Sequence, residues 1–213
     1  SLISGIYWCV RKQSALYLLF NFHLGNFINQ AIKITVCAYR PWIRDNRITP
    51  VDSARPGASG YSFPSGHTAK AMAVWGGLAV YDFKRNKPIA SFLLLIILVV
   101  GFSRNYLGVH TPQDVIVSLI LGGFILYSTY YLLIWADKKR GRDWITAGSI
   151  TLASILLVFY AKNKSYPLDY IDGQLLVNPQ QMINGCFRGC GGIIGLAYGW
   201  VLDRKLIHYN EPR

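Results

Sequence analysis

The sequence is poor in charged residues, and acidic residues are the scarcest of them. Charged side chains make up 15% of the 213 residues, with 10 Asp or Glu against 22 Lys or Arg, whereas hydrophobic residues make up 52%. So little charge among so many apolar residues is not typical of a soluble domain and indicates a membrane protein. The net charge of +12 would favour a nucleic-acid partner in a soluble protein. In a membrane protein basic residues follow topology instead, so we expect no nucleic-acid partner.

Cysteine is also scarce, and potential metal ligands are scattered. The four cysteines are Cys9, Cys37, Cys186 and Cys190. They do not form the pattern of a disulfide framework, since Cys186 and Cys190 stand one turn apart on a single predicted helix, and we interpret all four as small apolar packing residues. No compact group of Asp, Glu and His occurs along the chain, so we expect neither a metal nor any other cofactor.

Long apolar runs set the fold class. A bilayer core of about 30 Å needs about 20 helical residues to cross it, and six apolar runs come close to this length: residues 14–36, 67–83, 88–102, 112–135, 144–161 and 185–202. The second and third are short, so either could be partly re-entrant. The runs do not alternate with period two, which argues against a transmembrane barrel. We therefore predict an all-α, polytopic transmembrane helical bundle with about six spans.

The predicted bundle is a single domain covering residues 1–213. The opening segment, residues 1–10, resembles the end of a helix, and no signal peptide is seen. The last predicted span is rich in glycines, spaced for close helix packing: Gly185, Gly189, Gly191, Gly192, Gly195 and Gly199.

Basic clusters predict the topology. They precede the first span, connect the second to the third and the fourth to the fifth, and follow the sixth: Arg11 and Lys12; Lys84, Arg85 and Lys87; Lys138, Lys139, Arg140 and Arg142; Arg204 and Lys205. An even number of crossings separates each cluster from the next, so all four lie on one face, which the positive-inside rule makes cytoplasmic. The loops after the first and third spans then share the extracytoplasmic or lumenal face.

These two outer loops carry basic residues with too few carboxylates to pair them. Lys33, Arg40 and Arg104 lie close to membrane depth, where a cation is costly unless it meets an anion. Phosphate is the natural partner, because guanidinium groups bind its oxygens in a bidentate way. The segment Pro64-Ser65-Gly66-His67 opens a predicted helix, whose free N–H groups also favour an anion, with Ser65 adding a hydroxyl donor.

A histidine and a carboxylate occur together where the second outer loop becomes a helix. Asp114 follows His110 by four residues, so it can bind one imidazole nitrogen and leave the other free to attack phosphorus. His67 is then available as general acid for the leaving oxygen. Each residue also has a simpler interpretation: Asp114 could only cap its helix behind Thr111, His67 could be a polar helix start, and Arg104 could snorkel to the interface.

The joint pattern resembles the phosphatidic acid phosphatase type 2 superfamily, whose motifs are KxxxxxxRP, PSGH and SRxxxxxHxxxD. All three occur in order: Lys33 to Arg40-Pro41, Pro64 to His67, and Ser103-Arg104 through His110 to Asp114. The resemblance covers residues 33–135, and the helices at 144–161 and 185–202 lie beyond it. It implies that Lys33, Arg40, Ser65, Gly66 and Arg104 bind phosphate, that His110 is the nucleophile oriented by Asp114, and that His67 protonates the leaving group.

The expected activity is therefore metal-independent hydrolysis of a lipid phosphate or pyrophosphate, in contact with membrane lipid. Phosphatidate, phosphatidylglycerol phosphate, polyprenyl pyrophosphates and sphingoid phosphates are all candidate amphiphilic substrates. The superfamily also includes vanadium-dependent haloperoxidases, but those are soluble, and six apolar runs argue against that activity. A non-catalytic lipid-binding or transport protein is a third possibility, which the intact His67, His110 and Asp114 disfavour.

Overall fold

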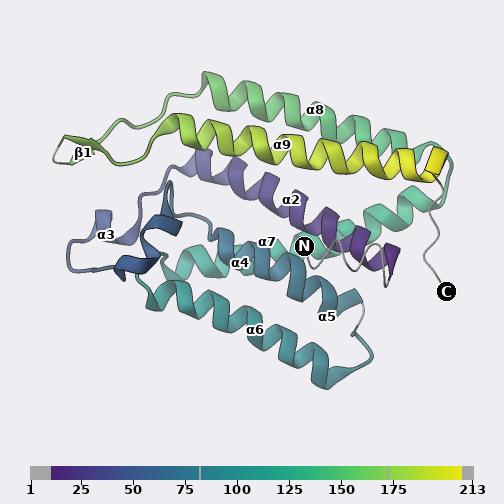
Figure 1. The fold of residues 1–213 in the computed structure, drawn as a ribbon, viewed down its shortest axis with the longest axis horizontal. Helices are drawn as coiled ribbons and strands as arrows, with labels where there is room; N and C mark the ends of the chain where they lie inside the picture. The colour runs from purple at the N-terminus through teal and green to yellow at the C-terminus, as the bar shows by residue number, and fades with distance from the viewer. Residues whose placement is uncertain (1–10, 82, 172, 208–213) are drawn as a thin grey trace.

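The computed structural model describes residues 11–81, 83–171 and 173–207 and is built from long helices that lie alongside one another (Figure 1). The long helices are α2 (Lys12–Val36), α6 (Lys87–Tyr106), α7 (Pro112–Asp137), α8 (Arg142–Asn163) and α9 (Pro179–Leu202). A sixth, nearly continuous helix consists of α4 (Gly66–Ala71), a π-helical turn η3 (Met72–Gly76) and α5 (Gly77–Tyr81). The all-α prediction is confirmed, whereas the predictions for residues 1–10, including Cys9, lie outside the described residues.

Shorter elements occupy the connections. The α2–α4 connection contains α3 (Pro41–Arg44) and two 3-10 turns, η1 (Asp52–Ala54) and η2 (Pro56–Ala58). The α8–α9 connection contains two short antiparallel strands, β1 (Tyr170–Ile171) and β2 (Gln174–Leu175), and a π-helical turn η4 (Asp203–Ile207) follows α9.

Helix α2 lies at the centre of the bundle, where it packs against α9, α7 and α4. This position explains its composition, because Asn21, Asn29 and Lys33 would be costly on a lipid-facing surface but are buried here inside protein. Apolar contacts surround them: Phe20 packs edge-on against Trp200 of α9, with ring centroids 5.3 Å apart. The polar face of α2 is therefore turned towards other helices.

Only half of the glycines predicted for close packing in α9 serve that purpose. A Cβ atom added at Gly185, Gly189 or Gly192 would lie within 3.2 Å of a side-chain atom of α2. Gly191, Gly195 and Gly199 have no such neighbour within 4 Å. The closely packed glycines recur at four- and three-residue steps, which keeps them on one helix face. Cys186 and Cys190 are buried in the apolar core beside this seam, as predicted.

Within the described residues, three helices are long and apolar enough to cross a membrane: α6, α7 and α8. Their outer surfaces carry many of the exposed large apolar side chains, among them Phe92, Leu95, Ile120, Phe124, Leu156 and Phe159. An apolar surface of this extent fits contact with lipid rather than water. The chain is thus a membrane protein, while the count of six crossings stays a prediction.

Helix α6 is longer than predicted. The sequence interpretation ended it at Phe102 because polar residues follow, but the helix continues to Tyr106 and reaches 20 residues. Polar residues are tolerated there because their backbone groups remain paired: the Leu107 amide donates to the Ser103 carbonyl at 3.0 Å. Ser103 and Arg104 therefore lie on the last helical turn, not in a loop.

The connections sort to opposite ends of the bundle. The α2–α4, α6–α7 and α8–α9 connections gather at one end (Figure 1), whereas the α5–α6 and α7–α8 turns lie at the other, together with the start of α2 and the end of α9. The predicted basic clusters lie at this second end, where Lys12 pairs with Asp203 and Arg204 with Asp137. All motif residues consequently face a single end of the molecule.

Candidate active site

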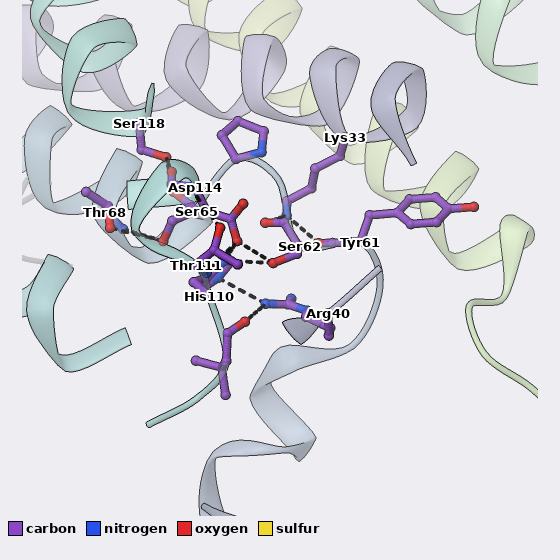
Figure 2. Close-up of polar contacts among 12 residues, drawn as sticks. Lys33, Arg40, Tyr61, Ser62, Ser65, Thr68, His110, Thr111, Asp114 and Ser118 are labelled. Carbon is purple, nitrogen blue, oxygen red and sulfur yellow. Dashed lines mark hydrogen bonds and ion pairs between the residues drawn. The ribbon is translucent and has the colours of Figure 1, made fainter. Parts of the chain in front are cut away.

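His110 and Asp114 form a buried pair at the start of α7 (Figure 2). His110 Nδ1 lies 3.1 Å from Asp114 Oδ2. The same oxygen accepts the Thr111 amide at 3.0 Å, and the Asp114 amide donates to Thr111 Oγ1 at 3.4 Å, which completes a capping box. Asp114 therefore caps the helix and also holds His110, so the two interpretations of this residue are compatible.

The second imidazole nitrogen of His110 faces Arg40. Arg40 Nη1 lies 3.0 Å from His110 Nε2, and since a guanidinium can only donate, Nε2 is the acceptor and Nδ1 carries the proton. Burial lowers the pKa of His110 to about 4; the Asp114 hydrogen bond opposes this shift, and the positive charges of Arg40 and Lys33 add to it. The ring is therefore neutral at physiological pH, with its lone pair on Nε2.

Arg40 is held by backbone carbonyls from two loops. Its Nε donates to the Gly60 carbonyl at 3.0 Å, Nη1 to the Val109 carbonyl at 2.9 Å and Nη2 to the Ser59 carbonyl at 3.4 Å. Gly60 has a φ of 78°, in the left-handed region that favours glycine. Burial lowers the pKa of Arg40 to about 10, so the guanidinium keeps its charge at neutral pH. Arg40 thus joins the first outer loop to the loop that carries His110.

Lys33 and Ser62 connect the same loop to α2 and to the carboxylate. Lys33 Nζ donates to the carbonyls of Tyr61 and Ser62 at 2.6 and 3.2 Å. The Ser62 hydroxyl donates to Asp114 Oδ2 and lies 3.3 Å from His110 Nδ1. Ser62 was not singled out from sequence, because a contact across 52 residues leaves no local pattern. It is a third polar partner of the His110–Asp114 pair.

The PSGH motif divides into buried and exposed parts. Ser65 is fully buried and caps α4, accepting hydrogen bonds from the Thr68 amide at 3.4 Å and the Thr68 hydroxyl at 3.0 Å. Its carbonyl accepts the Ser118 hydroxyl at 3.0 Å. Gly66 and His67 instead line a cleft, which Ser65 does not. A phosphate contact from Ser65 therefore stays a prediction.

Two adjoining hollows form this cleft, with volumes of about 280 and 140 Å³. Both are lined by Arg40, Gly57, His67 and His110. The larger adds Lys33 and Lys70, and the smaller adds Arg104, whose Nε donates to Ser103 Oγ at 3.2 Å. The cleft thus brings together residues of all three sequence motifs, with Asp114 directly behind His110. In the described parts of the chain, no group of three or more His, Cys, Asp or Glu could hold a metal ion.

The C-terminal helices support the site from outside. Lys164, after α8, donates to the carbonyls of Ile34 and Thr35 at the end of α2, the latter at 2.8 Å. The Tyr39 hydroxyl donates to Asp169 Oδ2 at 2.6 Å. Met182 of α9 lines the larger hollow, and its Sδ would lie 2.6 Å from a Cβ added at Gly60. The end of α2 and the loop that carries Arg40 are therefore contacted by the α8–α9 connection and by α9.

Comparison with known protein families supplies the classification. The sequence profile of the PAP2 superfamily matches residues 14–138, which is more than half of the chain. The chain belongs to the PAP2 superfamily. The match spans all three motifs and ends before α8, so the last two long helices lie outside the region that defines this family.

Several characterised proteins are similar in sequence. Undecaprenyl-diphosphatase BcrC of Bacillus subtilis is 33% identical over 48% of this chain and 51% of its own length. Phosphatidylglycerophosphatase B of the same organism is 29% identical over 65% of this chain and 66% of its own length. Undecaprenyl-diphosphatase of Sulfolobus acidocaldarius is 28% identical, covering 54% of this chain and 53% of its own length. The chain thus spans about half to two thirds of these relatives, and no solved structure gives a significant match.

Proposed function

We propose that this chain is a membrane phosphatase that hydrolyses a lipid phosphate or pyrophosphate monoester through a phosphohistidine intermediate. One observation carries the proposal: His110 lies between Asp114 and a cation-lined cleft, with its Nε2 lone pair on the cleft side. That arrangement suits a nucleophile held by a carboxylate. Membership of the PAP2 superfamily supports the same reaction class.

In the first step, Nε2 of His110 attacks phosphorus and the bond from phosphorus to the lipid oxygen breaks. Arg40 must release Nε2 before this attack, and its guanidinium is then placed to bind the equatorial phosphate oxygens with Lys33 and Arg104. His67 donates a proton to the departing oxygen. In the second step, water attacks the phosphohistidine, with His67 accepting its proton, and inorganic phosphate leaves.

An amphiphilic substrate is supported by the membrane character of the bundle and by the relatives. Their names assign them an undecaprenyl diphosphate and a phosphatidylglycerophosphate, two lipids with different headgroups. The shared feature is a phosphate at the polar end of a lipid. We infer that the helices cross the membrane repeatedly and that the cleft opens on the extracytoplasmic or lumenal face, because the basic clusters lie at the opposite end.

A phosphate-release panel tests the activity. Purified protein in detergent is supplied with phosphatidate, phosphatidylglycerol phosphate, a polyprenyl diphosphate and a sphingoid phosphate, each assayed with and without excess EDTA. We expect release from at least one lipid and none from His110→Ala. Because cationic side chains supply the charge stabilisation, EDTA should leave the rate unchanged. The proposal would be contradicted if no lipid released phosphate, or if phosphate were released only when Mg²⁺ was added.

Impermeant thiol labelling tests the topology. Single cysteines replace Arg55, Asn105 and Lys139 in a background without native cysteines. In intact cells we expect labelling at positions 55 and 105, which lie at the end that holds the cleft, and none at position 139, which lies at the other. Labelling at position 139 before cell lysis would reverse the assigned orientation.

A further inference from the structure

Lys70 is a cation of the cleft that belongs to none of the three sequence motifs. It follows His67 by three residues on α4, so both side chains lie on the same helix face. Both also line the larger hollow, together with His110. Lys70 lines the larger hollow but not the smaller one, whereas His67 and His110 line both. Lys70 therefore belongs to the part of the cleft that extends away from the smaller hollow and its Arg104.

Among the residues that the structure describes, Lys70 has no carboxylate partner. No Asp or Glu is present among the described residues that line either hollow. Throughout the described ranges, no carboxylate lies within ion-pairing distance of Lys70 or Arg104. Apart from its cations and histidines, the larger hollow is lined by uncharged residues, among them Asn26, Gln30 and Met182. Lys70 is therefore a cation of the larger hollow that is available to an anionic group of a bound substrate.

The charges of the cleft distinguish two kinds of substrate. Lys33, Arg40 and Arg104, less the charge of Asp114 behind His110, leave a surplus of two positive charges. That surplus matches a phosphate monoester, which carries about two negative charges at neutral pH. Lys70 adds a third positive charge, and a second phosphoryl group adds about one more negative charge to the substrate.

We propose that Lys70 binds the second phosphate of a diphosphate-linked lipid and thereby favours lipid diphosphates over lipid monophosphates. This inference rests on the phosphatase activity proposed above. His110 attacks the terminal phosphorus, and the bond to the bridging oxygen breaks. The electron pair goes to the departing lipid monophosphate, whose bridging oxygen receives the His67 proton. Lys70, an exposed cation of the larger hollow, stabilises the negative charge of that departing phosphate as a charge-assisted donor.

The test compares farnesyl diphosphate with farnesyl monophosphate, which share one lipid chain. Lys70→Met keeps most of the side-chain volume and removes the charge; Lys139→Met, at the opposite end of the bundle, is the matched control. For Lys70→Met we expect the ratio of kcat/KM for diphosphate to that for monophosphate to fall about tenfold, the effect of losing one charge-assisted contact. Inorganic pyrophosphate should also inhibit Lys70→Met less strongly than it inhibits the wild-type protein, whereas competitive inhibition by inorganic phosphate should be the same for both. Lys70→Arg should restore most of the ratio.

Two results would overturn the inference. One is a ratio for Lys70→Met equal to that of the control, including the case in which both activities fall together. The other is wild-type protein that hydrolyses the monophosphate alone, which removes the role of Lys70 but leaves the phosphatase proposal intact. If wild-type protein releases phosphate neither from these two substrates nor from the lipid panel, the phosphatase proposal itself is wrong, and the inference about Lys70 falls with it.

Discussion

Asp114→Asn changes the charge next to His110 while keeping the size of the side chain. When Nε2 of His110 bonds to phosphorus, the ring becomes a cation, and the carboxylate lies 3.1 Å from its Nδ1. At that separation, with an effective dielectric constant of about 20, two unit charges attract by about 5 kcal/mol. Losing most of this attraction in the transition state should lower kcat by about 1,000- to 10,000-fold. The equivalent substitution in a Ser-His-Asp triad lowers kcat by about 10⁴.

Thr111→Val is the control that separates catalysis from helix capping. It removes the hydroxyl that accepts the Asp114 amide but leaves the carboxylate and its contact with His110. Loss of a cap should lower stability by about 0.5–2 kcal/mol, visible as a lower Tm, with little change in kcat for the folded protein. Asp114→Asn keeps an oxygen that can still accept the Thr111 amide, so its Tm should change less than its rate.

The assay is steady-state phosphate release, combined with thermal unfolding of each variant in the same detergent. Substrate binding should survive Asp114→Asn, because the cations that line the cleft remain. If Asp114→Asn kept more than about a tenth of wild-type kcat, the electrostatic reasoning would be refuted. If Thr111→Val lost as much activity as Asp114→Asn, the carboxylate would matter for helix capping alone.

Three further predictions concern the nucleophile, the acid and the loop. Because the pKa of His110 is lowered to about 4, the ring gains a proton and loses its lone pair only as pH falls through that value; kcat/KM should decline there, and an acid limb near pH 6.5 would contradict this. His67→Ala should slow release from lipid alkoxides at least about tenfold more than from p-nitrophenyl phosphate, whose oxygen leaves without protonation; equal losses would argue against His67 as the acid. Gly60→Ala should cost about 1–2 kcal/mol of stability through its positive φ, and should lower activity by displacing the carbonyl that holds Arg40. Combining it with Met182→Ala should relieve the close contact but not the φ strain, and full recovery of Tm in the double variant would show that the contact alone matters.

Features encoded by short-range patterns were predictable from sequence. The long apolar runs correspond to helices, and the four-residue spacing of His110 and Asp114 anticipates their contact. The predicted end of α6 was wrong. A helix can continue into polar residues at the edge of the apolar layer as long as its backbone hydrogen bonds can still form. The apolar runs therefore predicted the existence of each helix more reliably than its ends.

Features that depend on long-range packing were not predictable. Ser62 contacts Asp114 in a loop that Lys33 and Arg40 also bind, through the carbonyls of Tyr61 and Gly60. Lys70 was not singled out from the sequence, because the PSGH motif marks the start of α4 but does not show how far along this helix the cleft extends. The interpretation of the α9 glycines was half right, because the sequence does not say which helix face meets α2.

The PAP2 region does not stand alone in this structure, because the α8–α9 connection and α9 contact the end of α2 and the first outer loop. A chain ended after residue 138 would keep every motif residue and the whole matched region. It would lose Lys164 from the end of α2, Asp169 from Tyr39 and Met182 from Gly60. Exchange of C-terminal helices between superfamily members would therefore alter the geometry around Arg40, and substitutions far outside the motifs can act as mutations of the loop that carries Arg40.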